Sequence, residues 1–170
     1  MGEKRCIIAN GLEMQFKSNL FTAVSSWYIL EHLENLGGAL REVVRVTQRG
    51  GVLILKAQDA RNGWDGHCKI PWLPFLSGNL SRAWAEEFGK SSEERRGVYD
   101  IMEPQVTAIL EACGCEIVAK ASPPIMLIRE HWQLNTEQEV RGTAQKVRAM
   151  MENNQWQPQP ENLIVYAVKQ

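Results

Sequence analysis

The chain has 170 residues, of which 44% are hydrophobic and 23% charged, and its formal net charge is -1. This length and composition indicate one globular domain with a sizeable core. The balanced charge argues against a nucleic-acid partner, because such proteins carry a basic excess. No apolar run approaches the roughly 20 residues of a membrane span, and the N-terminus lacks the apolar stretch of a signal peptide. We therefore expect a cytoplasmic protein with no nucleic-acid or membrane partner.

The four cysteines, Cys6, Cys68, Cys113 and Cys115, are interpreted as reduced thiols. Without a secretory signal, disulfides are not expected. A structural zinc site needs about four ligands at recognisable spacing, and no second pair accompanies Cys113 and Cys115. The sequence therefore predicts structural thiols and no metal ligands.

The first expected elements are two strands. A short apolar run, residues 6–9, stops at the turn pair Asn10-Gly11 and predicts a strand that ends there. A second strand is expected over residues 21–26 (FTAVSS). Together they would bring two strand ends to one edge of a sheet.

A helix and a third strand follow. Apolar residues at near-helical spacing between positions 30 and 44 predict a helix that begins near Gly38 and ends before Gly50. The pair Gly50-Gly51 predicts a turn that leads into a strand. Residues 52–55 (VLIL) are four apolar residues without alternation, which is typical of a strand buried on both faces of a parallel sheet. A strand, a crossover helix and a parallel strand form a βαβ unit.

Residues 57–103 have a different character. They hold Trp64, Trp72, Trp84 and His67, and Trp84 lies on the apolar side of an expected short amphipathic helix. An aromatic-rich insertion after a parallel strand is a candidate lid or substrate wall. Equally, it could be a helical hairpin that packs its tryptophans inward.

The rest of the chain predicts helices and strands in turn. The expected elements are a helix from Glu103-Pro104 to a cap at Gly114, a strand over 115–119, an apolar run of unclear assignment over 125–128, a helix that opens with the Thr136/Glu139 capping box, and a final strand over 163–168.

The order of these pieces resembles the C-terminal two-thirds of a class I S-adenosylmethionine-dependent methyltransferase. The segments that carry the likeness are ANGLEMQF, FTAVSSWYILEHL, ALREVVRVTQRGGVLIL, VTAILEACGCEIV and NLIVYAVK. The resemblance implies an α/β, partial Rossmann-like fold. Its sheet would be mostly parallel with an antiparallel last strand, and a helical insertion would follow the fifth family strand. Residues 1–170 would form a single truncated domain with residues 57–103 as its lid.

The sequence departs from the family where the cofactor is usually held. The family's glycine-rich turn and its acidic ribose anchor have no counterpart, and no Gly-x-Gly-x-Gly occurs in the chain. The acidic residue expected beside adenine is Asn10, and the expected aspartate after Phe21 is Thr22. A sheet that lacks the family's first strands would expose an edge and an apolar face. We therefore expect a homo-oligomer, a partner chain that covers the open sheet, or a fragment of a longer protein.

The resemblance places the cofactor, S-adenosylmethionine, against two segments. The turn Asn10-Gly11-Leu12 is the adenine-side candidate, and its alternative is an ordinary strand-ending turn. Ser25, Ser26 and Trp27 follow the family's fourth strand, where ligands of open parallel sheets bind. Their alternative is a helix cap by Ser26 with a packed Trp27.

Two histidines are the catalytic candidates. His32 lies in a Glu-His pair that resembles the family's, and it would act as a base, as a substrate contact or as a structural contact. His67 would be a substrate-side residue if the insertion is a lid, and otherwise a surface histidine. His131 has no motif around it and is not a candidate.

Three functions remain open. The chain is a methyltransferase for an unknown small molecule, with an incomplete cofactor site in the isolated chain. Alternatively, it is a non-catalytic, methyltransferase-like interaction or regulatory subunit. A third possibility, a flavodoxin-like binding domain, would lack the antiparallel strand pair at the end of the sheet. Neither the substrate nor the methylated atom can be deduced from the sequence, because in methyl transfer the cofactor carries the activated group.

Overall fold

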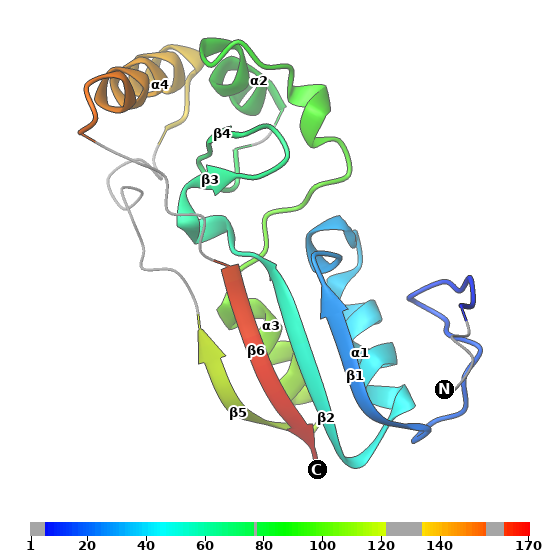
Figure 1. Ribbon diagram of the computed structural model, residues 1–170. Coiled ribbons are helices and arrows are strands. Elements are labelled where there is room, and N and C mark those ends of the chain that lie inside the picture. Colours follow the sequence, from blue (N-terminus) through cyan, green and yellow to red (C-terminus); the bar gives the residue numbers. More distant parts are fainter. Residues whose placement is uncertain (1–5, 77, 122–133, 156–161) are drawn as a thin grey trace.

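The computed structural model describes residues 6–76, 78–121, 134–155 and 162–170 (Figure 1). A four-stranded sheet with two helices forms one half of the molecule, and shorter elements with two further helices form the other. In chain order the elements are β1 (Phe21–Trp27), the 3-10 helix η1 (Leu30–His32), α1 (Leu36–Val46), β2 (Thr47–Gln58), η2 (Ala60–Asn62), β3 (Trp64–Asp65), β4 (Ile70–Pro71), α2 (Gly78–Glu87), η3 (Ser92–Arg95), α3 (Glu103–Ala112), β5 (Cys115–Ala121), α4 (Glu137–Glu152) and β6 (Asn162–Lys169).

The main sheet has the strand order β1-β2-β6-β5. Strand β1 pairs with β2 in parallel, whereas β6 runs antiparallel to both of its neighbours, β2 and β5. Three of the four strands therefore share one direction. The predicted sheet, mostly parallel with an antiparallel last strand, is confirmed, and the antiparallel β6 argues against the flavodoxin-like alternative.

Buried and more exposed side chains alternate along the central strands, and the buried ones form the main core. In β2, Leu53, Leu55 and Ala57 are fully buried, and they belong to one apolar cluster with Leu40 of α1 and Leu110 of α3. Both helices cover the same face of the sheet (Figure 1). Because side chains of a strand alternate between its two faces, the intervening residues of β2 point away from these helices.

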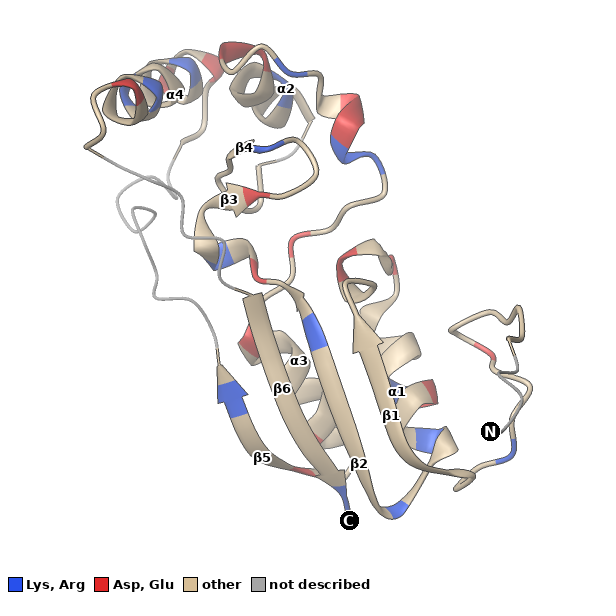
Figure 2. Ribbon diagram, viewed as in Figure 1, with Lys and Arg blue, Asp and Glu red and all other residues tan. Residues whose placement is uncertain are grey.

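The other face of the sheet, which we call the open face, is apolar and accessible. Val52 of β2, Tyr166 of β6 and Val118 of β5 are exposed large hydrophobic residues. The strands carry few charged side chains (Figure 2). No described strand pairs with the outer edge of β1, so one edge of the described sheet has free backbone groups.

The double glycine lies inside a strand and not before it. Strand β2 begins at Thr47, which pairs with Phe21, and pairing then resumes at Ala23↔Val52 after a register shift. Gly50 has φ +73°, and a Cβ on Gly51 would meet a backbone oxygen at 2.8 Å. The expected turn is therefore a glycine bulge that bends β2 where it emerges from α1.

We call residues 60–100 together with α4 the cap. The cap has its own apolar cluster, in which Trp72 and Trp84 are buried against Val140 and Ala144 of α4. The predicted amphipathic helix is confirmed as α2, with Trp84 on its buried side. Two of the three tryptophans thus pack inward, whereas Trp64 is half-buried.

Ion pairs join the two helices of the cap. The Arg141 guanidinium on α4 binds the carboxylate of Glu86 at 2.6 Å and that of Glu87 at 3.1 Å, both on α2. The predicted capping box of α4 is also confirmed, because the Thr136 side chain accepts from the Glu139 amide and the Glu139 carboxylate accepts from the Thr136 amide.

The predicted helix from Glu103, the strand after Gly114 and the final strand are confirmed as α3, β5 and β6, whereas the strand predicted over residues 6–9 is wrong. Residues 6–9 form no strand: Ile7 and Ile8 are exposed, and no described strand lies beside them to supply the hydrogen bonds that a strand needs. The four cysteines are free thiols. Residues 125–128 and His131 lie outside the described residues. Among the described helices, none is long and apolar enough to cross a membrane.

Candidate functional site

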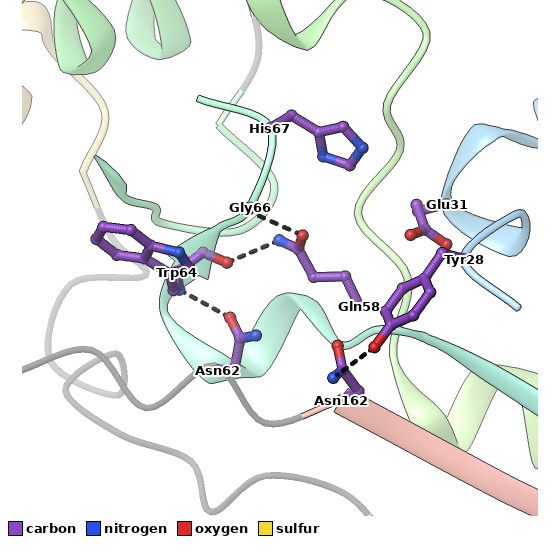
Figure 3. Close-up of a pocket in the computed structure, with 8 residues that line it drawn as sticks. All are labelled: Tyr28, Glu31, Gln58, Asn62, Trp64, Gly66, His67 and Asn162. Atoms are coloured by element: carbon purple, nitrogen blue, oxygen red, sulfur yellow. Dashed lines mark hydrogen bonds between the residues drawn. The ribbon is translucent and has the colours of Figure 1, made fainter. Parts of the chain in front are cut away.

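A pocket of about 360 Å³ lies where the carboxyl ends of β1 and β2 meet the cap (Figure 3). Its walls come from the segment after β1, from the end of β2, from the β3–β4 hairpin and from the start of β6. The lining residues are Tyr28, Glu31, Gln58, Asn62, Trp64, Gly66, His67 and Asn162. Open parallel sheets bind their ligands at this end of the strands.

The chain turns sharply at Tyr28 to enter the pocket wall. Tyr28 has φ +55°, and its amide donates to the carbonyl of Lys56 on β2 at 2.8 Å. Its phenol oxygen lies 3.1 Å from Asn162 Nδ2, which donates to it from the first residue of β6. The left-handed backbone thus directs the following η1 helix over the strand ends.

The hairpin on the cap side is held by one side chain of β2. Gln58 Nε2 donates to the carbonyl of Trp64 at 2.7 Å, and its Oε1 accepts from the amide of Gly66 at 3.1 Å (Figure 3). The next residue, His67, therefore has a fixed starting point above the pocket. A Cβ on Gly66 would lie 3.2 Å from Gln58 Oε1, so the small residue leaves room for this contact.

A buried carboxylate supports the hairpin from behind. Asp65 is fully buried, and its Oδ1 accepts from the amides of His67 and Cys68 at 2.8 and 2.7 Å. Its Oδ2 accepts from Arg95 Nε at 2.5 Å, and the same guanidinium binds Asp100 at 2.7 Å. These contacts hold the loop that carries His67 against the segment that leads to α3.

The two predicted catalytic residues, His32 and His67, lie together although 35 positions separate them. Their Nε2 atoms are 3.2 Å apart, and their rings meet edge-to-face with centroids at 5.0 Å. We call them the histidine pair. His32 Nδ1 lies 3.2 Å from the carbonyl of Gly97, which can only accept, so this contact places a proton on Nδ1 and leaves Nε2 with a lone pair.

Glu31 completes this group. Its residue is 3% exposed, and its Oε2 is buried without a hydrogen-bond partner among the described residues. One carboxylate oxygen of Glu31 and one nitrogen of each imidazole all lie within 4.8 Å of one another. A buried carboxylate oxygen without a partner is costly, so a cation or a donor from a ligand would stabilise it.

The predicted cofactor residues fall in two separate places. Ser25, Ser26 and Trp27 end β1 directly before Tyr28, and Trp27 is 55% exposed, with Lys56 Nζ 5.6 Å from its ring. The predicted helix cap by Ser26 does not form, because Ser26 is still part of β1.

The other predicted cofactor segment is the turn Asn10-Gly11-Leu12. It is exposed, and the Asn10 side chain accepts from the Leu12 amide at 3.0 Å. It lies outside the set of residues that line the pocket. The role of both segments in cofactor binding stays a prediction.

Several pocket residues were not singled out from the sequence. No functional motif marks these residues. Tyr28 directly follows β1, Gln58 is the last residue of β2, and Asn162 is the first residue of the antiparallel strand β6. The rule that strand ends of one sheet meet at a shared edge would have found them.

Comparison with known proteins agrees with this fold. A family model described as "Methyltransferase domain" matches residues 2–55. No curated protein matches the chain in sequence. The structure of an S-adenosylmethionine-dependent methyltransferase from Mesorhizobium loti is 12% identical, with a TM-score of 0.52 over 95% of this chain and 67% of that one.

A second solved structure gives a similar result. Geranyl diphosphate C-methyltransferase from Streptomyces coelicolor, in complex with Mg²⁺, geranyl diphosphate and S-adenosyl-L-homocysteine, is 13% identical. Its TM-score is 0.51, over 96% of this chain and 52% of that one. This chain thus spans about half to two thirds of the length of these two structures. The resemblance to class I methyltransferases is confirmed in sequence over residues 2–55 and in fold over nearly the whole chain.

Proposed function

Because the chain has the fold of class I S-adenosylmethionine-dependent methyltransferases, we propose that it acts in methyl transfer to a small molecule. The observation that carries this proposal is the pocket at the carboxyl ends of β1 and β2, roofed by the cap and bordered by the histidine pair. Its volume of about 360 Å³ suits a small acceptor. The proposed compartment is the cytoplasm, where free cysteines stay reduced.

S-adenosylmethionine would supply a methyl group already activated on sulfur. The chain has two tasks left, which are to align the acceptor and to take its proton. His32 Nε2 carries a lone pair and lies beside His67, which lines the pocket, so it is the proposed proton acceptor. Trp27 and Lys56, at the ends of β1 and β2, would form the wall between acceptor and cofactor.

A calorimetric titration with S-adenosyl-L-homocysteine tests this proposal. We expect saturable one-to-one binding that Trp27→Ala and Asn10→Ala each weaken by about tenfold, since both remove a ligand contact and leave the main core unchanged. Tyr166→Ala is the matched control, because Tyr166 is an exposed aromatic residue on β6, which β2 separates from β1, and lies outside the pocket. Absence of heat from folded protein would contradict the proposal.

A second function is favoured by the edge of the sheet. The outer edge of β1 is unpaired among the described residues, and the strand (FTAVSSW) contains no charge and no proline that would discourage pairing. This unpaired edge supports a non-catalytic subunit that interacts through β1. We propose a second copy of this chain as the occupant of this edge.

Light scattering tests whether two copies of the chain pair through β1. We expect a dimer that Ser25→Lys weakens, because a lysine on an exposed edge position opposes pairing. Ala119→Lys on β5 is the matched control, since it adds the same single charge at an exposed position of the opposite edge strand. A monomer at all concentrations would contradict self-pairing. Dimerisation without binding of S-adenosyl-L-homocysteine would favour the non-catalytic function.

A further inference from the structure

We propose that Glu31, His32 and His67 bind one divalent transition-metal ion, with Zn²⁺ as the best match. None of these residues was expected to be a metal ligand. The proposal comes from side chains of two elements, η1 and the β3–β4 hairpin, that the fold brings to one point. One carboxylate and two imidazoles make a ligand set found in catalytic zinc sites, which keep a position open for water or substrate.

The spacing of the two imidazoles fits one ion. Two nitrogens at about 2.0–2.1 Å from a tetrahedral zinc ion are roughly 3.3 Å apart. The Nε2 atoms of His32 and His67 are 3.2 Å apart. One carboxylate oxygen of Glu31 lies within 4.8 Å of one nitrogen of each imidazole, so the three side chains converge on one point. The His67 side chain is partly exposed, so an ion can reach it from solvent.

His32 and His67 each make a contact through Nδ1, which leaves Nε2 of each ring to face the metal ion. His32 Nδ1 donates to the carbonyl of Gly97 at 3.2 Å, and His67 Nδ1 lies 3.9 Å from the buried carboxylate of Asp65. Metal-bound histidines are commonly held in this way, by a carbonyl or a carboxylate on the second nitrogen. The contact to Asp65 is longer than a hydrogen bond, and it favours a proton on His67 Nδ1 through charge.

An alternative explanation is a simple hydrogen bond between two neutral imidazoles. In that bond His67 carries its proton on Nε2, so its Nδ1 can only accept. Nδ1 then faces the carboxylate of Asp65, which is also an acceptor. It also leaves Glu31 Oε2 buried without a partner. Arg95 lines a neighbouring hollow together with Glu31, and its guanidinium already binds Asp65 and Asp100. A metal ion satisfies both imidazoles and the carboxylate at once, so we favour it over the hydrogen bond.

The remaining coordination positions of the ion would face the pocket, which Glu31 and His67 line. An oxygen or nitrogen atom of the acceptor would bind there, and the ion would lower its pKa so that its proton passes to water. With the ion bound, His32 Nε2 is a ligand and does not act as the proton acceptor. Metal binding itself does not depend on methyl transfer. Only this use of the ion rests on the proposed function.

Metal titration of the full, untagged chain tests the site. The Cys6→Ser background removes an exposed thiol that would bind zinc nonspecifically. With a chromogenic chelator as competitor, we expect one equivalent of Zn²⁺ to bind, and much weaker binding of Mg²⁺, which prefers oxygen ligands. Glu31→Gln, His32→Gln and His67→Gln should each weaken Zn²⁺ binding by more than about tenfold. His131→Gln is the matched histidine control.

Glu31→Gln separates this site from nonspecific binding by two nearby histidines. An affinity unchanged by Glu31→Gln in a protein with native circular dichroism would overturn the proposal, as would the absence of saturable Zn²⁺ binding. Co²⁺ supplies a second measurement, since bound Co²⁺ should show visible d–d bands without a thiolate charge-transfer band. A titration of the same variants with S-adenosyl-L-homocysteine keeps the two proposals apart, because cofactor binding can persist when metal binding is lost.

Discussion

The sheet region and the cap are stabilised by different interactions. In the sheet, buried apolar side chains such as Leu53 and Leu55 alternate with residues of the open face, and the helices α1 and α3 cover them. In the cap, a smaller apolar cluster is combined with buried or partly buried charges, above all Asp65 and Arg95. An apolar core tolerates apolar substitutions of similar volume, whereas loss of one partner of a buried ion pair leaves the other charge unpaired. The cap is therefore the part in which a single charge change should have the largest local effect.

The largest effect on stability is expected in the sheet. Leu53→Ala removes a fully buried side chain between α1 and α3 and should cost about 2–5 kcal/mol of unfolding free energy. The neighbouring Val52→Ala, on the open face, should cost less than about 1 kcal/mol. Urea denaturation measures both. Equal losses would contradict the assignment of a covered and an open face.

A somewhat smaller effect is expected in the cap. Asp65→Asn removes the charge that Arg95 binds and should cost about 2–3 kcal/mol, because Arg95 keeps only Asp100. Hydrogen exchange should accelerate in the β3–β4 hairpin and leave β2 unchanged. Glu93→Gln, which alters an exposed pair with Arg96, is the control and should change stability by no more than about 0.5 kcal/mol. Equal acceleration in β2 would show that the two regions are not distinct.

A smaller loss of unfolding free energy, about 1 kcal/mol, is expected at the N-terminus of α4. Thr136→Ala removes the side chain that accepts from the Glu139 amide, whereas Thr136→Ser keeps an accepting hydroxyl. Thermal denaturation should therefore rank wild type and Thr136→Ser above Thr136→Ala. A Thr136→Ser variant as unstable as Thr136→Ala would show that the methyl group of Thr136 stabilises the protein, and not the hydroxyl group at the N-terminus of α4.

The smallest change in stability at neutral pH is expected at Cys68 in the cap. Burial, with the nearby carboxylates of Asp65 and Glu94, raises the pKa of its thiol from 9.0 to about 11. The native state then holds this proton more tightly than the unfolded state. Stability from the buried thiol is complete below pH 9 and is lost as the pH rises from 9 toward 11. Cys68→Ala should flatten this decline, while Cys6→Ser should leave it in place. An identical alkaline decline in Cys68→Ala would exclude the thiol as its cause.

Much of the fold could be predicted from the sequence, because its signals are local. The run Val52–Leu55, the Glu103-Pro104 helix start and the Thr136 capping box each predict an element that the structure contains. The expected strand over residues 6–9 failed, because an apolar run forms a strand only where a neighbour pairs with it. The glycine bulge was mistaken for a turn, since Gly-Gly favours both.

The candidate site could be predicted only in part. His32 and His67 were singled out separately, but their approach to 3.2 Å depends on the Gln58 and Asp65 contacts that place the hairpin. Such contacts join residues far apart in the chain and leave no local pattern. The importance of Glu31 has the same origin, because its burial without a partner appears only once η1 is packed under the cap.

Hydrogen exchange with and without S-adenosyl-L-homocysteine tests the central claim most directly, namely that the strand ends of β1 and β2 form a methyltransferase pocket. At saturating ligand, we predict slower exchange for the amides from Ser26 to His32 and for the end of β2, and little change in α4. Both samples should be held at one oligomeric state. No protection at these strand ends, or protection confined to α4, would contradict the account.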